Sequence, residues 1–202
     1  NWSGLNFNLN PINPVYIGYN NAGLYIALTW TNEYTRIFTS EDGVNFENDE
    51  HNIPLEVYGY NVEYFKGLFI VGVKADANHL IWTSPDGRIW TPRVTPTTST
   101  LVNGITFASD GNQIIGVTDS YSGAMRSFDG ITWQPVFGIT TEIATIAYSA
   151  EQKIWLCFSP NGVGFTSADG LNWTNIGTIV SIVGAIGLIW VGNNINRWYL
   201  AG

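Results

Sequence analysis

Thr166-Ser-Ala-Asp-Gly-Leu-Asn-Trp173 decides the fold of this chain, because close copies of it recur along the sequence. The copies are Thr39-Ser-Glu-Asp-Gly-Val-Asn-Phe46, Thr83-Ser-Pro-Asp-Gly-Arg-Ile-Trp90 and Ser127-Phe-Asp-Gly-Ile-Thr-Trp133. A weaker copy, Asn1-Trp-Ser-Gly-Leu-Asn-Phe7, carries Ser3 where the others have aspartate. The shared pattern is S-x-D-G-x-x-W/F, and it marks a repeated turn.

Each position of the repeated turn has a physical role. An Asp-Gly pair between apolar strands favours a hairpin, because glycine adopts a positive φ without steric cost. The carboxylate accepts hydrogen bonds from turn amides, the serine hydroxyl adds another, and the aromatic residue points into a core. The sequence therefore predicts a structural role for Asp42, Asp86, Asp129 and Asp169, and for Phe46, Trp90, Trp133 and Trp173.

The spacing of the copies predicts the architecture. Successive aspartates lie 44, 43 and 40 residues apart, and Ser3 lies 39 residues before Asp42. A period of this length with a hairpin in each copy is typical of propeller blades. We therefore expect an all-β fold, a five-bladed β-propeller with four-stranded antiparallel blades, in a single domain spanning residues 1–202.

Alternating apolar segments between the turns predict three further strands in each unit, from the propeller axis outward. They are expected at 15–19, 24–30 and 36–40; at 57–64, 68–74 and 79–83; at 101–108, 113–118 and 124–127; at 143–148, 153–158 and 162–167; and at 179–185, 188–191 and 197–200.

The two ends of the sequence complement each other. Leu-Ala-Gly202 followed by Asn1-Trp-Ser-Gly reads as one more copy of the repeated turn. We therefore expect the N-terminal strand, residues 5–9, to pair with residues 197–200, complete the last blade and close the ring, which removes exposed sheet edges. The alternative is a fragment of a larger ring.

The repeated turn resembles the Asp-box of sialidase-like and sortilin-like propellers, whose usual form is S-x-D-x-G-x-x-W. Here glycine follows aspartate directly, and the resemblance covers four good copies and one poor one. In those families the boxes act structurally, on the face opposite the ligand site. The resemblance implies that role for the four aspartates. Blade number and repeat length also resemble small five-bladed lectins of the tachylectin type, at the level of the fold alone.

Composition excludes several classes of partner. The net charge is −8 and only three residues are lysine, which argues against nucleic acid and anionic membranes. No apolar run is long enough for a membrane helix, and one cysteine allows no intrachain disulfide. We expect no cofactor and no metal site, because the acidic segment 48–51 reads as an exposed loop. An extracellular or virion-surface location is favoured.

The sequence gives little support for an enzymatic function. A sialidase needs a cluster of arginines, but the five arginines here belong to third strands or follow a turn. A glycosidase needs two neighbouring carboxylates at the axis, and the inner strands offer only Glu63 and Glu142. We therefore expect no catalytic residues and no enzyme.

The loops opposite the repeated turns are the expected ligand-binding face. Aromatic rings suit the apolar face of a sugar, and asparagine offers both donors and acceptors to its hydroxyls. The candidate ligand-binding residues are Trp30, Tyr34, Asn78, Tyr121, Asn161 and Asn194. Ordinary turn asparagines and partly buried aromatics are the alternative interpretation of the same residues.

These observations predict a non-enzymatic binding module. The leading ligand class is a glycan, and a protein ligand remains open. The alternative is a structural or adhesion display domain within a larger chain or assembly, such as a viral or phage particle or a fibre protein.

Overall fold

The computed structural model describes residues 6–7, 14–30, 35–47, 58–74, 80–96, 104–118, 124–179, 187–191 and 197–201. Every regular element in these ranges is a β-strand, which confirms the predicted all-β class. None of the described segments forms a helix long and apolar enough to cross a membrane.

The strands form successive antiparallel sheets, which we name units 1 to 5. The short strand β1 (Asn6–Phe7) precedes them. Unit 1 contains β2 (Pro14–Tyr19), β3 (Tyr25–Trp30) and β4 (Thr35–Ser40), followed by β5 (Asn45–Phe46). Unit 2 contains β6 (Tyr58–Phe65), β7 (Leu68–Lys74), β8 (Ile81–Ser84) and β9 (Thr91–Arg93). Unit 3 contains β10 (Ile105–Ser109), β11 (Ile114–Thr118), β12 (Ala124–Ser127) and β13 (Trp133–Pro135). Unit 4 contains β14 (Thr145–Ser149), β15 (Ile154–Phe158), β16 (Val163–Ser167) and β17 (Thr174–Thr178). Unit 5 contains β18 (Gly187–Val191) and β19 (Arg197–Ala201).

Each unit is a meander in which neighbours in sequence are neighbours in the sheet. Units 2, 3 and 4 are four-stranded, as predicted, and β2, β3 and β4 form a three-stranded sheet. In unit 1 the backbones of Thr39 and Glu47 exchange two hydrogen bonds, of 3.0 and 2.9 Å, so the chain after β5 runs beside β4. Units 1 to 4 therefore share one connectivity.

In units 1 to 4 the bounds of the strands agree closely with those predicted from the sequence. Differences occur at the first strands, where the chain passes from one unit to the next. The strand expected from residue 143 begins at Thr145. Before it, the Ile143 amide donates to the carbonyl of Thr118 in unit 3, at 2.9 Å. This amide therefore links two sheets instead of entering the ladder of its own sheet.

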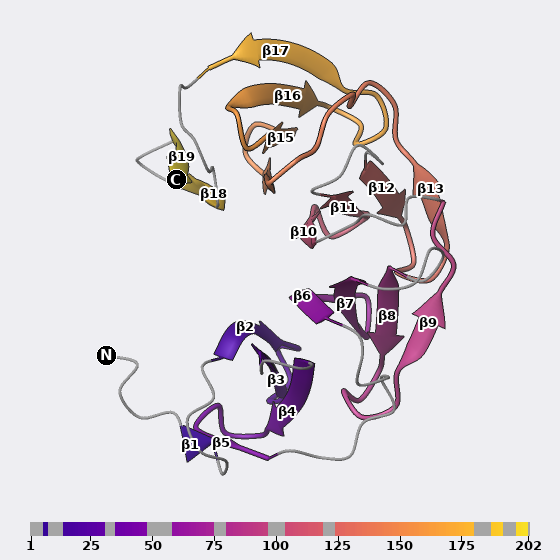
Figure 1. The fold of residues 1–202 in the computed structure, drawn as a ribbon, viewed down its shortest axis with the longest axis vertical. Helices are drawn as coiled ribbons and strands as arrows, with labels where there is room; N and C mark the ends of the chain where they lie inside the picture. The colour runs from indigo at the N-terminus through magenta and orange to yellow at the C-terminus, as the bar shows by residue number, and fades with distance from the viewer. Residues whose placement is uncertain are drawn as a thin grey trace.

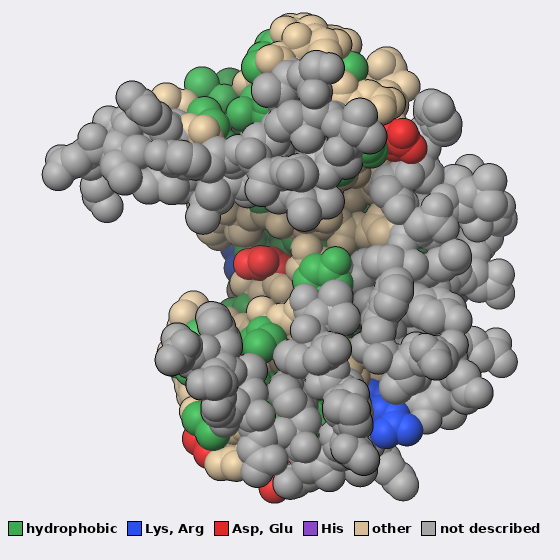
Figure 2. All heavy atoms as spheres, turned by 60° about the vertical axis from the view of Figure 1, so that its left-hand side comes forward, with side chains coloured by type: hydrophobic (Ala, Val, Ile, Leu, Met, Phe, Trp, Pro, Cys, Tyr) green, Lys and Arg blue, Asp and Glu red, His purple; other side chains and the backbone are tan. Residues whose placement is uncertain are grey.

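The units follow one another around an arc with their first strands towards its centre (Figure 1). The innermost labelled strands are β2, β6, β10 and β18, β14 packs against β10 and β18, and the outermost labelled strands β9, β13 and β17 lie on the rim. The sequence predicted residues 188–191 as the second strand of unit 5, but in the structure they belong to β18, the innermost described strand of that unit, which pairs with β19. The strand predicted first, at 179–185, lies outside the described residues except for Ile179. Viewed from the open side of the arc, the surface is hollowed between units at its two ends (Figure 2). The arrangement is propeller-like.

Strand β1 differs from expectation in its partner. Asn6 and Phe7 pair in parallel with Asn45 and Phe46 of β5, and not with β19. The same kind of contact joins units 3 and 4, where Phe137 bridges Asn172 in parallel. In both places a segment of the chain pairs in parallel with residues that follow the Asp-Gly of a repeated turn.

The hydrophobic core lies between the units. One cluster joins Ile26 and Leu28 of unit 1 to Val62 and Trp90 of unit 2. Equivalent clusters join unit 2 to unit 3 and unit 3 to unit 4. The one cysteine, Cys157, is buried in the last of these, as an inert thiol would be. Each sheet therefore buries both faces only when a unit packs on either side of it.

The aromatic residues of the repeated turn belong to this core. Phe46, Trp90, Trp133 and Trp173 are all buried. The three indole groups donate to the carbonyl of the glycine in their own turn, at 2.9 Å for Trp90, 3.3 Å for Trp133 and 3.4 Å for Trp173. The aromatic residue therefore ties the turn to the interior.

Replacing Trp133 with alanine should destabilise the fold by about 3–5 kcal/mol, because it opens a large cavity between units 2 and 3. Ile131 lies in the same turn but is 43% exposed, so Ile131→Ala should change stability by no more than about 0.5 kcal/mol. Urea unfolding of both variants measures the difference. Equal losses would show that Trp133 is not a core residue.

Candidate functional site

Each repeated turn is held by one aspartate oxygen and one serine hydroxyl. In unit 3, Oδ1 of Asp129 accepts from the amides of Ile131 and Thr132, at 2.8 and 2.7 Å. Ser127 Oγ donates to the same oxygen at 2.9 Å and accepts from the Gly130 amide at 2.8 Å. The same bonds recur at Asp42, Asp86 and Asp169.

These bonds keep the aspartates ionised. The backbone bond from Asn45 lowers the pKa of Asp42 well below its usual range, and the bond from Asn172 does the same for Asp169. At Asp86 and Asp129 burial raises the pKa, but the turn amides outweigh it and the net shift is downward. A carboxylate committed in this way is a structural acceptor and a poor proton donor.

Units 1 and 4 add one further bond to the turn. The side-chain amide of Asn45 donates to Oδ2 of Asp42 at 2.7 Å, and that of Asn172 donates to Oδ2 of Asp169 at 2.9 Å. Unit 2 carries Ile89 at this position, and unit 3 carries Thr132, whose hydroxyl, instead of an amide, forms a hydrogen bond with Asp129. The turns of units 1 and 4 therefore form a matched pair.

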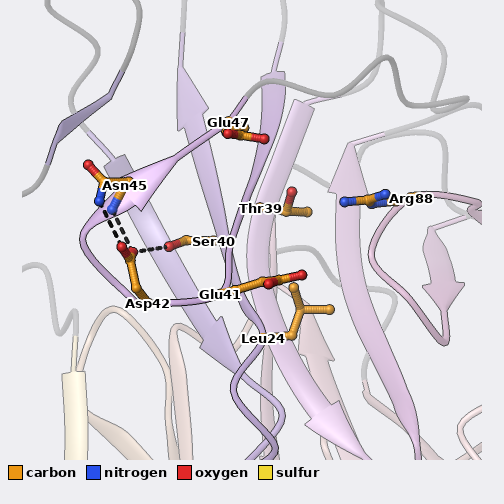
Figure 3. Close-up of a pocket in the computed structure, with 8 residues that line it drawn as sticks. All are labelled: Leu24, Thr39, Ser40, Glu41, Asp42, Asn45, Glu47 and Arg88. Carbon is orange, nitrogen blue, oxygen red and sulfur yellow. Dashed lines mark hydrogen bonds between the residues drawn. The ribbon is translucent and has the colours of Figure 1, made fainter.

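A cavity of about 450 Å³ lies beside the turn of unit 1. Figure 3 shows its wall, with Glu47 and Glu41 toward opposite ends, Thr39 between them and Arg88 reaching towards Thr39 from the turn of unit 2. The lining is completed by Leu24, Ser40, Asp42 and Asn45. This cavity combines carboxylates, hydroxyls, an amide and a guanidinium at the junction of two units.

A second cavity, of about 420 Å³, lies at the equivalent place in unit 4. It is lined by Ile154, Thr166, Ser167, Ala168, Asp169, Asn172 and Thr174. Sequence reasoning missed both cavities, because it assigned the turns a structural role alone. The available signal was the shared Thr-Ser-x-Asp-Gly-x-Asn string, which only these two copies carry.

The inner strands carry one half-buried carboxylate in the described units. Burial raises the pKa of Glu63, which lies on β6. The strand registers place Gly18, Ala108 and Ala147 at the same level in units 1, 3 and 4. Among these described strands, the paired carboxylates of a glycosidase are not present at that level.

Most of the predicted ligand-binding residues lie outside the described part of the chain. These are Tyr34, Asn78, Tyr121 and Asn194, and the side chain of Trp30, which is the last residue of β3. Asn161 is exposed in the turn between β15 and β16, at the opposite end of β16 from Asp169. The proposed grouping of these six residues stays a prediction.

The segment 48–51, considered as a cation site, also lies outside the described ranges. Within the part of the chain that the structure describes, no three His, Cys, Asp or Glu side chains gather closely enough to hold a metal ion. The acidic residues of the unit 1 cavity therefore do not form a metal cluster.

No protein-family model matches the sequence, and no curated protein matches it. Solved structures with a similar fold include YCF48 bound to D1 peptide, with a TM-score of 0.65 and 13% sequence identity. That match covers 95% of this chain and 61% of the YCF48 chain. At this identity the likeness shows the fold alone.

Two further structures have the same kind of fold. A chain of a nidogen/laminin complex matches with a TM-score of 0.63 and 8% identity, over 93% of this chain and 71% of that one. A GH74 enzyme from Niastella koreensis matches with a TM-score of 0.60 and 14% identity, over 85% of this chain and 33% of the enzyme. The chain thus has a propeller-like fold that occurs in proteins of different activities.

Acid should weaken the repeated turns, and Asp86→Asn isolates the effect. Its Oδ1 can still accept from Arg88, Ile89 and Ser84, but the side chain no longer titrates. Because the pKa of Asp86 is lower in the folded chain than in the unfolded one, its stabilisation is complete above about pH 4 and is lost as the pH falls further.

At pH 6 the wild type should exceed Asp86→Asn in free energy of unfolding by about 0.5–1 kcal/mol, a small value because water screens an exposed carboxylate. The difference should shrink as the pH is lowered from about 5 to about 2. Urea unfolding across this range provides the measurement. A gap that stays constant or widens in acid would contradict the assigned role.

Proposed function

We propose that this protein is a non-enzymatic binding module that recognises glycans on the face opposite the repeated turns. The observation that carries the proposal is the unequal chemistry of the two ends of each sheet. At one end the aspartates are bound by their own turn amides in all four described turns. At the other end the loops differ from unit to unit in sequence, as recognition loops do.

Antiparallel geometry supports this placement. A loop that joins the second and third strands of a unit lies at the end of the third strand remote from the repeated turn. Trp30, Tyr34 and Tyr121 would stack on sugar rings there, and Asn78, Asn161 and Asn194 would bind hydroxyls. Because shallow polar sites gain little after desolvation, each site should be weak, at about millimolar Kd, and avidity would require several sites.

The absence of catalysis is part of the proposal. The aspartates of the turns are locked as acceptors, and Glu63 has no partner carboxylate at its level in units 1, 3 and 4. The GH74 enzyme has a similar fold, but at 14% identity it gives no residue to carry over. The comparisons also include YCF48 bound to D1 peptide and a nidogen/laminin complex, which makes a protein the second ligand class.

A display domain within a larger assembly is the alternative function. It is favoured by large apolar side chains that stay exposed along the repeated turns and the segments after them, as at an assembly contact. They are Val44, Ile89, Phe128, Ile131 and Phe137.

A glycan array followed by titration tests the glycan proposal. Tyr34→Ala and Tyr121→Ala should each weaken binding of the glycan found by the array about tenfold, because stacking on the sugar is lost. Ile89→Ala, on the other face, serves as the matched control and should bind as the wild type does. Unchanged affinity in both tyrosine variants would refute the placement, and an array with no binding would favour the display domain.

We further propose that the five units are the blades of one closed ring. At the level of Ile17 in β2, units 2, 3 and 4 carry Val62, Phe107 and Ile146, which are only 4%, 6% and 4% exposed because the preceding unit covers them. Ile17 is 39% exposed. Packing of unit 5 against unit 1 would bury Ile17 in the same way and fill the hollow of Figure 2.

Ile17→Ala distinguishes a closed ring from an open one. In a closed ring the substitution should lower the free energy of unfolding by about 2–4 kcal/mol, as for a buried isoleucine. Val62→Ala provides the buried reference and Val94→Ala, 71% exposed, the exposed one. If Ile17→Ala behaves like Val94→Ala in urea unfolding, the ring is open at this point.

A further inference from the structure

The cavities of units 1 and 4 lie at equivalent places and have similar volumes, but their lining differs in charge. Position by position they pair Leu24 with Ile154, Thr39 with Thr166, Ser40 with Ser167, Asp42 with Asp169 and Asn45 with Asn172. The two remaining pairs are Glu41 with Ala168 and Glu47 with Thr174. The repeat therefore builds the cavity, and of the two cavities that of unit 1 has in addition the carboxylates of Glu41 and Glu47 and the guanidinium of Arg88 from unit 2.

In units 2 and 3 arginines of the chain itself take the equivalent place. Thr83 corresponds to Thr39, and its Oγ1 accepts from Nε of Arg93 at 2.8 Å. In unit 3 the corresponding residue is Arg126, whose Nη1 lies 3.4 Å from the carbonyl oxygen of Asp169 in the next unit. In units 2 and 3 a guanidinium of the chain itself therefore lies beside the third strand, in unit 1 Arg88 of unit 2 lines the cavity, and among the described residues no arginine lines the cavity of unit 4.

The two added carboxylates are available to a ligand. Asp42 already accepts hydrogen bonds from Ser40, Val44 and Asn45. Glu41 and Glu47 are exposed, and no side-chain hydrogen bond or ion pair joins either of them to another residue of the described chain. Figure 3 places them toward opposite ends of the cavity, on either side of Thr39.

We propose that the cavity of unit 1 receives an arginine side chain of a protein partner, with Glu41 and Glu47 binding its guanidinium. The planar guanidinium presents its donors in a rigid fork and can donate to two carboxylates at once. A lysine ammonium has no such fixed geometry. A volume of about 450 Å³ leaves room for the backbone that adjoins the arginine. The net charge of −8 would attract a basic partner.

This proposal goes beyond glycan recognition, because it concerns the other face of the molecule and another ligand class. The probe is the blocked pentapeptide acetyl-Gly-Gly-Arg-Gly-Gly-amide, added to ¹⁵N-labelled full chain. The side-chain amides of Asn45 and Asn172 report on the two cavities separately in NMR spectra, since each lines one of them. In the wild type the Asn45 signal should shift with peptide and the Asn172 signal should not.

Two double variants test the role of the carboxylates. Glu41→Gln with Glu47→Gln should weaken the peptide at least about tenfold, because the charged partners of the guanidinium are lost. Ala168→Glu with Thr174→Glu should create a second site in unit 4, seen as a peptide-dependent shift of Asn172. All four positions are exposed, so both variants should retain the wild-type fold.

Three outcomes would overturn the proposal. The first is an unchanged peptide affinity in Glu41→Gln with Glu47→Gln, or no shift of Asn45 in the wild type. The second is equal binding of the same peptide with citrulline in place of arginine, which is neutral and similar in shape. The third is equal binding of free arginine, which would point to a small molecule instead of a protein segment. Glycan titration of the same variants keeps this result separate from the proposed function.

Discussion

One aspartate oxygen in each of the four described repeated turns is the constraint on which the rest of the structure depends. It accepts two backbone amides and a serine hydroxyl, as at Asp129, and so fixes a turn of few residues without help from the core. The following glycine then approaches the preceding unit. In unit 2, Gly87 has a φ of +74°, and a methyl group on it would lie 2.5 Å from Cδ1 of Ile26. A local turn thereby sets the distance between neighbouring sheets.

The packing that follows is cooperative between units. The clusters that contain Val62, Phe107 and Ile146 each draw side chains from two successive sheets. A sheet of this kind has two apolar faces, so an isolated unit would leave both of them in water. Ile17, at one end of the arc, is exposed because no described unit packs on that face of unit 1. A further sheet that packed there would bury this apolar side chain and stabilise the fold.

Repetition also separates what holds the fold from what can bind a ligand. The turn residues that recur in units 1 to 4 are hydrogen bonded to one another, so ligand chemistry must come from positions that vary. On the turn side those positions are Glu41 and Glu47 in unit 1, where unit 4 has Ala168 and Thr174. On the opposite side they are the loops between second and third strands. The two proposed ligand sites therefore have no residue in common.

Much of the fold was predictable from the sequence, because a repeated turn and alternating apolar residues are local signals. The strands β7 and β12 have the expected bounds, and the aromatic residues of the turns lie in the core. The predicted ligand-binding residues were chosen on chemistry alone, and of these Asn161 is the one whose side chain the structure describes, exposed beyond the end of β15.

Only the tertiary structure decided how units meet. The parallel pairing of Asn6 and Phe7 with β5, against the expectation of β19, depends on which free edge comes nearest in space. The unit 1 cavity likewise joins Leu24, residues 39–47 and Arg88, which are brought together by sheet register and by the packing of unit 2 on unit 1. A sequence with period near forty residues determines each unit by itself. The contacts between units follow from long-range packing, which no local pattern encodes.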